Sequence, residues 1–397
     1  MNLLLTRCVN NRRLIWENTR MELNRRQFTL SSVATLLGVA TDVRAQADDK
    51  IILGQSAPLT GPAAQLGLQF QQGAKLCFDQ VNAQGGVGKR LIELQTLDDG
   101  YEPDRCAENT RKLIAQDVFA LFGYVGTPTS AVALPQAIKA KMPFIAPCTG
   151  AMVLRDPLNR YAFHVRASYN DETALIVKQL TSLGLKKIAV FYQNDSYGKA
   201  GLDGVTLAMG ARQLKPIASG TVERNSVDVA KAVSAIVASM PEAVVQVGAY
   251  KACAAFIRQA RKAGYGGLFY NVSFVGTQAL SDELGKEAAG VVVSQVMPSP
   301  YDASRLITRE FQQAVKAAGK GASANYSSME GYVAARVVVE GLKRAGARPS
   351  RDALITGLES MGTQLLADFS VSFSANDHVA SHFVEVSMLT ADGRVRT

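Results

Sequence analysis

Short apolar runs alternate with amphipathic stretches along most of the chain. The runs Ile51–Gly54 and Phe119–Gly123 are typical of strands buried on both faces, and Leu91–Leu97 alternates like a strand. Between these runs, apolar residues recur at helical spacing from about Gln69 and again over roughly Asp104–Gln116. This β-α-β-α-β order predicts a parallel sheet, and ligands of such sheets bind beyond the carboxyl ends of the strands.

The loops that follow these strands, at 57–65, 98–102 and 123–130, should therefore face one cleft. A fourth short strand over Pro143–Pro147 ends in another loop on the same side, at Cys148–Ala151. The carboxylates Asp98 and Asp99 lie at a strand end before a glycine, so we interpret them as turn or capping residues and not as an acid–base pair.

A second series of strands and helices follows with the same rhythm. Its strands are predicted at Ile188–Tyr192, Ala218–Val222, Ala243–Val247, Leu268–Asn271 and Val291–Val296. Asp171 is placed to cap the helix that precedes the series. Further helices are expected near 304–318, 329–344 and 351–357, and closing strands at 369–373 and 383–389. The predicted fold class is α/β, with two doubly wound parallel-sheet lobes.

The first 45 residues have the composition of a leader. The pair Arg25–Arg26 precedes a short apolar core at Val33–Ala40, and small residues precede a cleavage point after Ala45. This pattern predicts a twin-arginine export signal, the alternative being an ordinary secretory signal with two chance arginines. Because such signals start near the arginines, Met21 is the expected true start.

Charge and composition exclude several classes of function. Residues 1–45 contain seven of the 43 basic residues and three of the 34 acidic ones, so the net charge of +9 falls to +5 without them. No dense basic tract is present, which argues against nucleic-acid binding. The sequence has no nucleophile-elbow motif, no phosphate-binding loop and only three scattered histidines, so we expect no enzyme activity, no cofactor and no metal site.

Four cysteines follow the leader, at positions 77, 106, 148 and 253. Their irregular spacing permits three pairings and selects none. Cys77 and Cys106 belong to successive helices, which a strand order 2-1-3 would place on opposite faces of the sheet. We therefore expect free, buried thiols.

Several motifs together resemble one family. The segments are SAPLTGPAAQLGLQFQQGAKLCFDQVNAQGGV, LDDGYEPDRCAENTRKLI, PFIAPCTGA, IAVFYQNDSYGKAG and VVQVGAYKACAAFIRQARKAG. They resemble the leucine/isoleucine/valine-binding proteins, the type I periplasmic substrate-binding components of ABC importers. The resemblance implies three hinge crossings, with one lobe formed by 50–167 and 298–373 and the other by 168–297 and 374–397.

The resemblance also implies a set of ligand-binding residues. Thr127 matches a hydroxyl residue that contacts a ligand carboxylate at a helix N-terminus. Cys148, Thr149 and Gly150 match a segment that offers backbone and hydroxyl groups. Tyr197 and Tyr250 match aromatic residues of the second lobe. For each of these residues the alternative is a purely structural role in capping, turning or packing.

Two departures from the family pattern alter the expected ligand. Ser273 and Phe274 stand where amino-acid binders carry the acid that pairs with the ligand's ammonium, and Leu66 replaces a loop tyrosine. An unpaired buried ammonium is costly, so a carboxylate without an α-ammonium, aliphatic or aromatic, is preferred to leucine. Tyr124 and Phe274, with Tyr197 and Tyr250, would line an apolar pocket. Asp171 or Asp195 would restore the ammonium site if either reached the cleft.

The resemblance thus implies a monomeric solute-binding protein of the periplasm that captures a small organic ligand between two lobes and delivers it to an ABC permease. A ligand-sensing protein of the same fold, feeding a receptor or regulator, is the first alternative. An exported α/β enzyme is the second.

Overall fold

The computed structural model describes residues 50–397. The export signal at Arg25–Arg26, the cleavage point after Ala45 and the alternative start at Met21 lie outside the described residues. None of the helices in residues 50–397 has the length and apolar character needed to span a bilayer.

The first sheet is wholly parallel and has the order β2-β1-β3-β4-β5. Its strands are β1 (Lys50–Ala57), β2 (Leu91–Asp98), β3 (Ala120–Phe122), β4 (Phe144–Ile145) and β5 (Ala162–Phe163). The helices that follow β1, β2 and β3 are α2 (Ala64–Ala83), α3 (Pro103–Ala115) and α4 (Thr127–Lys139). Phe122 belongs to the main apolar core, whereas Leu121 belongs to a second one, so successive β3 side chains serve opposite faces of the sheet.

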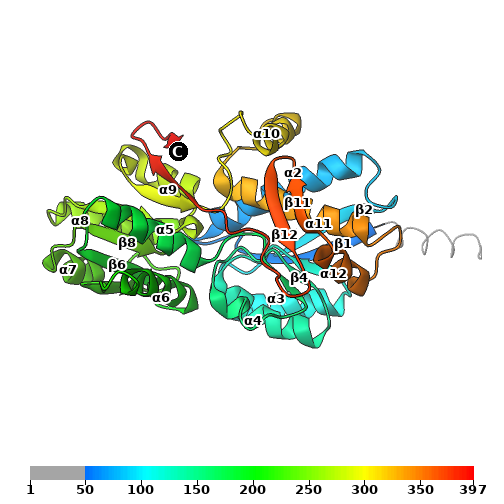
Figure 1. The fold of residues 1–397 in the computed structure, drawn as a ribbon, viewed down its shortest axis with the longest axis horizontal. Coiled ribbons are helices and arrows are strands. Elements are labelled where there is room, and N and C mark those ends of the chain that lie inside the picture. Colours follow the sequence, from blue (N-terminus) through cyan, green and yellow to red (C-terminus); the bar gives the residue numbers. More distant parts are fainter. Residues whose placement is uncertain (1–49) are drawn as a thin grey trace, which may run out of the picture. The chain divides into compact units, whose positions relative to one another are not determined.

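The second sheet has the order β14-β13-β10-β9-β8-β6-β7, in which β13 pairs antiparallel with both β10 and β14, and the other pairs are parallel. Its strands are β6 (Ile188–Gln193), β7 (Ser219–Val222), β8 (Ala243–Val247), β9 (Leu268–Asn271), β10 (Val292–Gln295), β13 (Glu385–Leu389) and β14 (Val395–Arg396). Its helices are α5 (Tyr169–Ser182), α6 (Ser196–Gly210), α7 (Ala230–Ala238), α8 (Tyr250–Lys262) and α9 (Thr277–Leu284), with 3₁₀ turns at Ser273–Val275 and Gly285–Ala288. Figure 1 shows α5–α8 gathered around β6 and β8.

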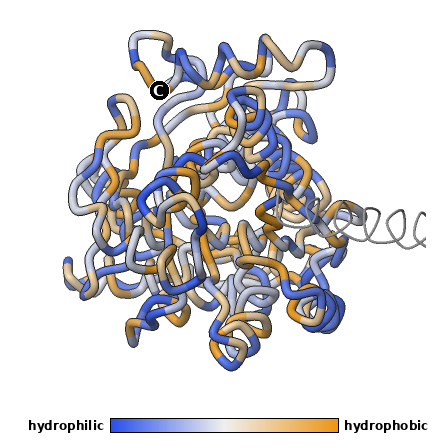
Figure 2. The backbone as a smooth tube through the Cα atoms, turned by 90° about the vertical axis from the view of Figure 1, so that its right-hand side faces the viewer, coloured by the Kyte–Doolittle hydropathy of each residue, from blue (hydrophilic) through white to orange (hydrophobic). Residues whose placement is uncertain are grey.

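A last group of elements joins the first sheet. It comprises α10 (Leu306–Ala318), α11 (Tyr326–Arg344), α12 (Arg351–Glu359) and the hairpin of β11 (Gly362–Leu366) and β12 (Phe369–Phe373). Helix α11 packs on α2, where the Tyr332 hydroxyl donates to Gln80 Oε1 over 3.0 Å. Figure 1 shows this group beside β1 and α2, and Figure 2 shows polar and apolar residues alternating along the backbone, as elements with one buried face require.

The chain passes between the two sheets three times, at residues 164–168, 296–305 and 374–384. The predicted fold class is confirmed: two α/β lobes with parallel-sheet cores, linked by three crossings. The predicted lobe boundaries fall within or beside these segments, and their exact positions stay a prediction.

Several details differ from the sequence-based expectation, among them the start of α5 and the strand β11. Ser168, not Asp171, is the N-cap of α5, and Asp171 is the third helical residue of a capping box whose side chain accepts from the Ser168 amide. The strand β11 was not expected, because its residues are largely exposed and lack an apolar pattern. All four cysteines in residues 50–397 are buried and free, as predicted.

Candidate functional site

Two threonines from different loops meet where the strands of the first lobe end. Thr127 begins α4, and Thr149 follows β4; both are fully buried, and their hydroxyl oxygens lie 2.6 Å apart. The first amides of α4 point out of the helix, so the two hydroxyls stand at a helix N-terminus that favours a negative charge. This corner can hold a carboxylate.

Four buried aromatic rings form one connected group beside this corner. Tyr101 comes from the first lobe, and Tyr169, Tyr197 and Phe274 come from the second. The ring centroids of Tyr197 and Phe274 are 4.8 Å apart, those of Tyr169 and Tyr197 5.4 Å, and those of Tyr101 and Phe274 6.0 Å. The Tyr101–Phe274 contact joins the two lobes.

Tyr101 is held in an unusual backbone conformation. Its φ is +65°, which is strained for a bulky residue, and its amide donates to Asp99 Oδ1 over 2.8 Å. Its ring covers Gly126, the residue before α4, where a Cβ would lie 2.3 Å from Tyr101 Cε2. The strain thus brings an aromatic ring directly against the helix N-terminus that carries Thr127.

The loop at Gly150 is equally tightly packed. A Cβ at Gly150 would lie 2.6 Å from the Tyr169 amide nitrogen, and that amide donates to the Gly150 carbonyl over 2.8 Å. The absence of a side chain therefore lets the Thr149–Gly150 loop lie against the start of α5.

A buried ion-pair network lies where the first crossing meets both lobes. Arg166 Nη2 donates to Glu172 Oε1 over 3.0 Å and also to the Ser273 hydroxyl. Glu172 receives three further hydrogen bonds, from the Ser273 amide (2.7 Å), the Ser273 hydroxyl (3.1 Å) and the Ser294 hydroxyl (2.5 Å). Both oxygens of Glu172 are thereby satisfied.

A second carboxylate reaches the same guanidinium from the first lobe. Glu330, on α11, lies 3.3 Å from Arg166 Nη1, and the Cys148 sulfur lies 3.6 Å from the same nitrogen. Burial raises the pKa of Glu330, and the charge of Arg166 opposes that rise. Arg166 thus ties Glu330 of one lobe to Glu172 of the other.

Polar contacts also join the loops at the edge of this site. Gln193 Nε2 donates to the Tyr101 hydroxyl over 3.4 Å. Arg224 donates to Glu102 over 3.0 Å, and Asn225 donates to the same carboxylate over 2.7 Å. These contacts link the loop after β2 in the first lobe to the end of β6 and the loop after β7 in the second, so the two lobes touch each other in this structure.

The structure brings together most of the residues that the sequence indicated. Thr127 contacts Thr149, Cys148 lies against Arg166, and Gly150 lies against Tyr169. Tyr197 and Phe274 share one aromatic group, and Ser273 contacts Glu172. Tyr250 begins α8, where burial raises the pKa of its phenol and a backbone hydrogen bond from Gln65 opposes the rise.

The structure places Tyr124 away from the apolar pocket that it was predicted to line. Its ring packs on Phe144 with centroids 5.0 Å apart, and its hydroxyl accepts from Thr110 over 3.2 Å. It lies in the core between the first sheet and α3 and α4, together with Cys106 and Leu113. The strand β3 ends at Phe122, and Gly123 has a φ of +63°, so the alternation of the strand does not continue. Tyr124 therefore lies in the core that contains Leu121, and not in the core that contains Tyr101 and Tyr197.

The acids of the site also differ from those expected. Asp171 is engaged by Ser168 and by His382, and Asp195 by Gln193 and Arg224 at the edge of the site. Sequence reasoning missed Glu172 and Glu330, as well as Arg166. The only available signal was the charged cluster Arg166–Glu172 at the first crossing, because Glu330 lies in the middle of a long helix.

Asp98 and Asp99 have the structural roles that were predicted. Burial acts to raise the pKa of Asp98, but hydrogen bonds from Thr60, Leu59 and Gly100 lower it to about 2. Burial raises the pKa of Asp99 to about 6, against hydrogen bonds from Ser56 and Tyr101 that lower it. Both carboxylates order the loops that carry the site.

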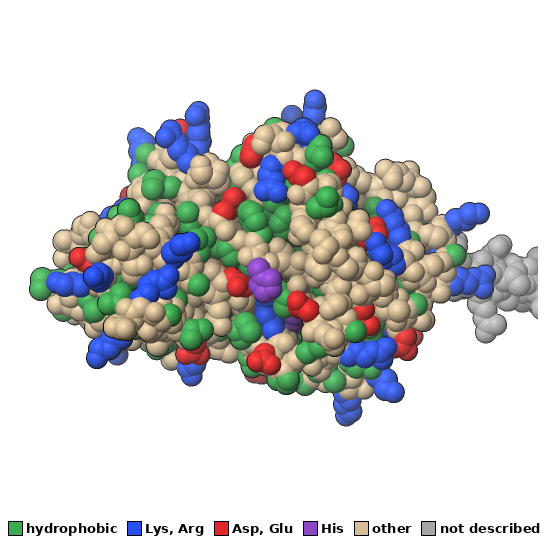
Figure 3. All heavy atoms as spheres, in the orientation of Figure 1, with side chains coloured by type: hydrophobic (Ala, Val, Ile, Leu, Met, Phe, Trp, Pro, Cys, Tyr) green, Lys and Arg blue, Asp and Glu red, His purple; other side chains and the backbone are tan. Residues whose placement is uncertain are grey.

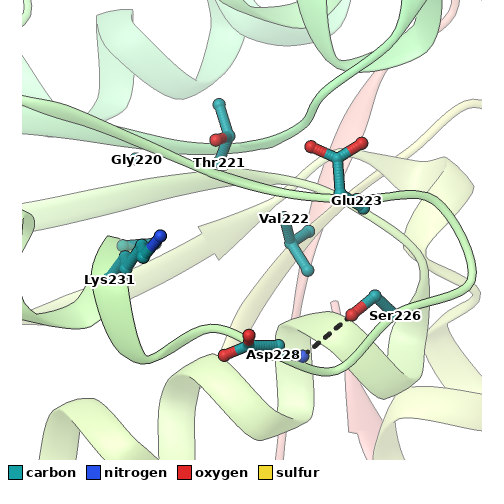
Figure 4. Close-up of a pocket in the computed structure, with 8 residues that line it drawn as sticks. Gly220, Thr221, Val222, Glu223, Ser226, Asp228 and Lys231 are labelled. Atoms are coloured by element: carbon teal, nitrogen blue, oxygen red, sulfur yellow. Dashed lines mark hydrogen bonds between the residues drawn. The ribbon is translucent and has the colours of Figure 1, made fainter.

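A separate hollow of about 440 Å³ lies at the outer edge of the second sheet. It is lined by residues of β7, of the loop after it and of the start of α7, among them Thr221, Glu223 and Lys231. Figure 4 shows the Asp228 amide donating to Ser226 there. It contains none of the predicted site residues. Figure 3 shows Lys and Arg side chains dispersed over the visible face and not gathered into a basic patch.

Comparison with known proteins gives a consistent result. The model of the periplasmic binding protein family matches residues 50–394. A Leu/Ile/Val-binding protein of Rhizobium johnstonii is 23% identical over 341 residues, which are 84% of this chain and 89% of the relative. The crystal structure of a possible leucine/isoleucine/valine-binding protein from Rhodopirellula baltica is 34% identical, with a TM-score of 0.82 over 87% of this chain and 95% of that one.

The crystal structure of a substrate-binding periplasmic protein from Ralstonia solanacearum has the same TM-score of 0.82 at 29% identity, over 87% of this chain and 99% of that one. These relatives are binding proteins and not enzymes. The two-lobed fold and these relationships agree: the chain belongs to the type I periplasmic binding proteins, in the leucine/isoleucine/valine-binding family.

Proposed function

We propose that this protein is an exported receptor that binds a small carboxylate between its lobes and delivers it to an ABC permease. The observation that carries the proposal is the pair of buried hydroxyls of Thr127 and Thr149 at the N-terminus of α4. One hydroxyl of the pair donates to the other, which leaves one hydroxyl donor and the positive end of the helix for a carboxylate.

The ligand carries no α-ammonium. The acids near the site, Glu172 and Glu330, are both bound by Arg166, so the buried guanidinium already occupies the position in which a ligand ammonium would find its counter-charge. Glu172 has no free oxygen, since four donors reach its two oxygens. A second cation would compete with Arg166 or remain unpaired at a cost of several kcal/mol.

The remainder of the ligand is apolar and flat. Tyr101, Tyr169, Tyr197 and Phe274 present aromatic faces from both lobes. Aromatic pairs prefer offset or edge-to-face contact at 4.5–7 Å, so an aromatic carboxylate can enter this group when the lobes separate and be enclosed when they close.

Ligand identification tests this proposal. Native mass spectrometry of the protein purified from its periplasm should reveal a co-purified carboxylate. Calorimetry should then compare pairs that differ only in the amino group, such as phenylalanine with 3-phenylpropionate and leucine with 4-methylpentanoate. Tighter binding of the deaminated member of each pair is expected; tighter binding of both amino acids would contradict the assigned ligand class.

Import and sensing remain distinct outcomes for the same binding site. If the protein serves import, deleting its gene should abolish uptake of the bound carboxylate in a strain with an intact permease. Loss of a transcriptional or motile response with normal uptake would favour the sensing alternative. As an importer's binding protein it acts as a monomer, and light scattering at micromolar concentration measures the molar mass that checks this.

A further inference from the structure

One end of the second lobe carries a row of exposed apolar side chains. The row follows the edge at which the parallel strands β6, β7, β8 and β9 begin, opposite the strand ends that carry the ligand loops. Its members are all more than a third exposed: Leu183 (61%), Leu207 (63%), Ile217 (40%), Met240 (76%) and Leu268 (37%). We call this row, with the basic residues around it, the distal end.

Backbone hydrogen bonds show that the strand starts along this row are neighbours. The Ile217 amide donates to the Ile188 carbonyl over 2.9 Å, which joins the starts of β7 and β6. The Glu242 amide donates to the Lys187 carbonyl over 2.8 Å, and the Leu268 amide donates to the Glu242 carbonyl over 3.0 Å. Because neighbouring strands lie about 5 Å apart, these residues form one continuous line across the sheet.

The remaining apolar members come from the helices that lead into these strands. Leu183 follows the last residue of α5, and Leu207 lies in the last turn of α6, which packs on α5. Met240 follows α7 and directly precedes the start of β8. A contiguous exposed apolar surface of this kind marks a contact with another molecule or with a membrane.

Exposed basic side chains surround the row. None of them belongs to an ion pair within residues 50–397, and they are Lys178, Lys186, Lys187, Arg212, Lys215 and Lys262. Basic residues near helix C-termini complement the helix dipole, which accounts for Lys178 and Lys262. Lys186, Lys187 and Lys215 lie in connections between helix and strand, where the dipole gives no such reason.

The acids near the row are fewer and mostly engaged. Glu242 is half-buried and accepts from the Lys186 and Lys187 amides over 2.7 and 2.8 Å. Asp203 is exposed on α6, one turn before Leu207. The charge of the distal end is therefore positive.

Farther along the same end of the lobe, the acids are paired. Glu283 and Glu287 lie 3.6 Å and 2.7 Å from nitrogens of Arg258. Asp392 lies 3.2 Å from Arg394 Nε. These pairs leave the excess of positive charge beside the apolar row.

The character of the distal end favours one kind of partner. A symmetric contact with a second copy of the chain would place basic residues against basic residues. Interfaces with other proteins draw most of their affinity from Trp, Tyr and Arg, whereas the row consists of Leu, Ile and Met flanked chiefly by lysines. Aliphatic side chains that enter the headgroup region, beside lysines that attract anionic lipids, are typical of surfaces that lie on membranes.

We propose that the distal end docks on a phospholipid bilayer with anionic headgroups. Leu207 and Met240 would enter the headgroup region, and Lys186 and Lys187 would lie at the level of the phosphates. Each basic residue near an anionic membrane strengthens binding by roughly fivefold, so the contact is reversible. The ligand loops stay accessible, because they lie at the opposite ends of the strands, and the docking is independent of which ligand the protein carries.

Vesicle co-sedimentation tests the docking. The protein is purified from the periplasm, and its N-terminus is sequenced to exclude a retained leader, which would itself bind lipid. It is mixed with vesicles of phosphatidylcholine alone or of phosphatidylcholine and phosphatidylglycerol in equal parts. Binding to the anionic vesicles should be saturable, at least tenfold tighter than to the neutral ones, and weaker at high salt. No binding to the anionic vesicles, or equal binding to both, would overturn the proposal.

A tryptophan probe locates the contact, because the single tryptophan of the chain, Trp16, lies in the leader. The indole of Met240→Trp should show a blue-shifted emission when anionic vesicles are added. Leu365→Trp is the matched control, since Leu365 is 59% exposed on β11 of the first lobe, and its emission should not shift. A shift in both variants, or in the control alone, would contradict docking through the distal end.

Charge variants identify the lysines involved. Lys186→Gln with Lys187→Gln should weaken binding to anionic vesicles by tenfold or more. Lys316→Gln with Lys320→Gln removes the same charge from exposed positions of the first lobe and should change the affinity less than twofold. Both double variants should keep the wild-type melting temperature in circular dichroism, since all four lysines are exposed.

Two further results would reject the distal end as a membrane contact. An equal loss of vesicle binding in the two double variants would indicate a general attraction by net charge. A dimer in light scattering that Met240→Ser dissociates, without vesicle binding, would assign the apolar row to a second copy of the chain.

Discussion

Arg166 and Glu330 are 164 residues apart in the chain, yet Arg166 Nη1 lies 3.3 Å from Glu330 Oε1 in the buried interior. Arg166 belongs to the first crossing, and Glu330 lies on a helix of the first lobe. Because Arg166 also binds Glu172 of the second lobe, one guanidinium holds a carboxylate from each lobe. The crossing is therefore fixed by charge as well as by its backbone.

The two sides of this network should respond unequally to mutation. Arg166→Met leaves Glu172 and Glu330 buried without a counter-charge and should lower the free energy of unfolding by about 3–5 kcal/mol. Glu330→Gln should cost much less, because Arg166 keeps Glu172. Urea denaturation measures both.

Arg344→Met is the control for that pair of variants. Arg344 binds Glu340 on the surface of the same helix, α11, over 3.0 Å, and such pairs contribute about 0–1 kcal/mol. If Arg166→Met is no more destabilising than Arg344→Met, the buried network does not hold the crossing.

The proposed carboxylate site at Thr127 and Thr149 is tested by removing one hydroxyl. Thr127→Val preserves shape and deletes a donor to the ligand carboxylate, so binding should weaken roughly tenfold or more, since a hydrogen bond to a charged group is worth about 1.5–3 kcal/mol. Calorimetry with the co-purified ligand measures the change. Thr221→Val, on the exposed edge strand β7, is the matched control. Equal affinities of the two variants would remove Thr127 from the site.

Closure of the lobes is tested at the edge of the site. Glu102→Gln removes the charge that binds Arg224 and weakens the acceptor of Asn225. Since this pair is partly exposed, the variant should shift the closed–open equilibrium only modestly, and less at high salt. Without ligand, small-angle scattering should show a larger radius of gyration for Glu102→Gln than for the wild-type protein. Once ligand saturates the site, the two radii should be the same. A radius unaffected by ligand in the wild-type protein would argue against closure.

Many helices and strands of this protein were predictable because the residue pattern of each segment by itself favours the element that the segment forms. The strands Ala243–Val247, Leu268–Asn271 and Phe369–Phe373 were predicted with the bounds observed, since each is a compact apolar or alternating run. The start of α5 was misplaced by three residues, because Ser168 and Asp171 both have capping side chains, and only the backbone geometry shows which one lies outside the helix.

The site was less predictable, for a physical reason. Thr127, Thr149 and Tyr197 follow strand ends, where a parallel sheet presents its ligands, so position along the chain indicated them. Tyr124 also follows a strand end but lies in the other core, because the positive φ of Gly123 interrupts the alternation of β3. Glu330 reaches the site through helix packing across the lobe, and nothing local in the sequence encodes that contact.

Export should depend on the arginine pair of the leader. Substitution of Arg25 and Arg26 by lysine should leave precursor in the cytoplasm, because the twin-arginine route reads that pair. Fractionation and immunoblotting measure the distribution, and N-terminal sequencing of periplasmic protein should begin at or near Gln46. The variant Arg44→Lys, which lies after Met21 and leaves the pair intact, is the control and should be exported normally. Normal export of the Arg25/Arg26 variant would indicate the general secretory route.

Adjacent carboxyl groups at the end of β2 should titrate in separate pH ranges. Burial raises the pKa of Asp99 to about 6, whereas hydrogen bonds lower that of Asp98 to about 2. The folded protein therefore holds a proton on Asp99 that the unfolded chain releases between about pH 4 and 6, and stability falls as pH rises through this range. Asp98 acts oppositely: its stabilisation is present above about pH 4 and is lost as pH falls toward 2.

Asp99→Asn should separate the two contributions. The amide keeps an acceptor for the Tyr101 amide and can donate to Ser56, but it cannot ionise. At pH 4 the variant should be no more stable than wild type, and by pH 7 it should have gained up to about 3 kcal/mol relative to it, since each pKa unit corresponds to about 1.4 kcal/mol. Urea denaturation at pH 4, 5, 6 and 7 gives the difference. A constant difference across that range would mean that Asp99 has an ordinary pKa and that the strained Tyr101 loop is held by an ionised carboxylate.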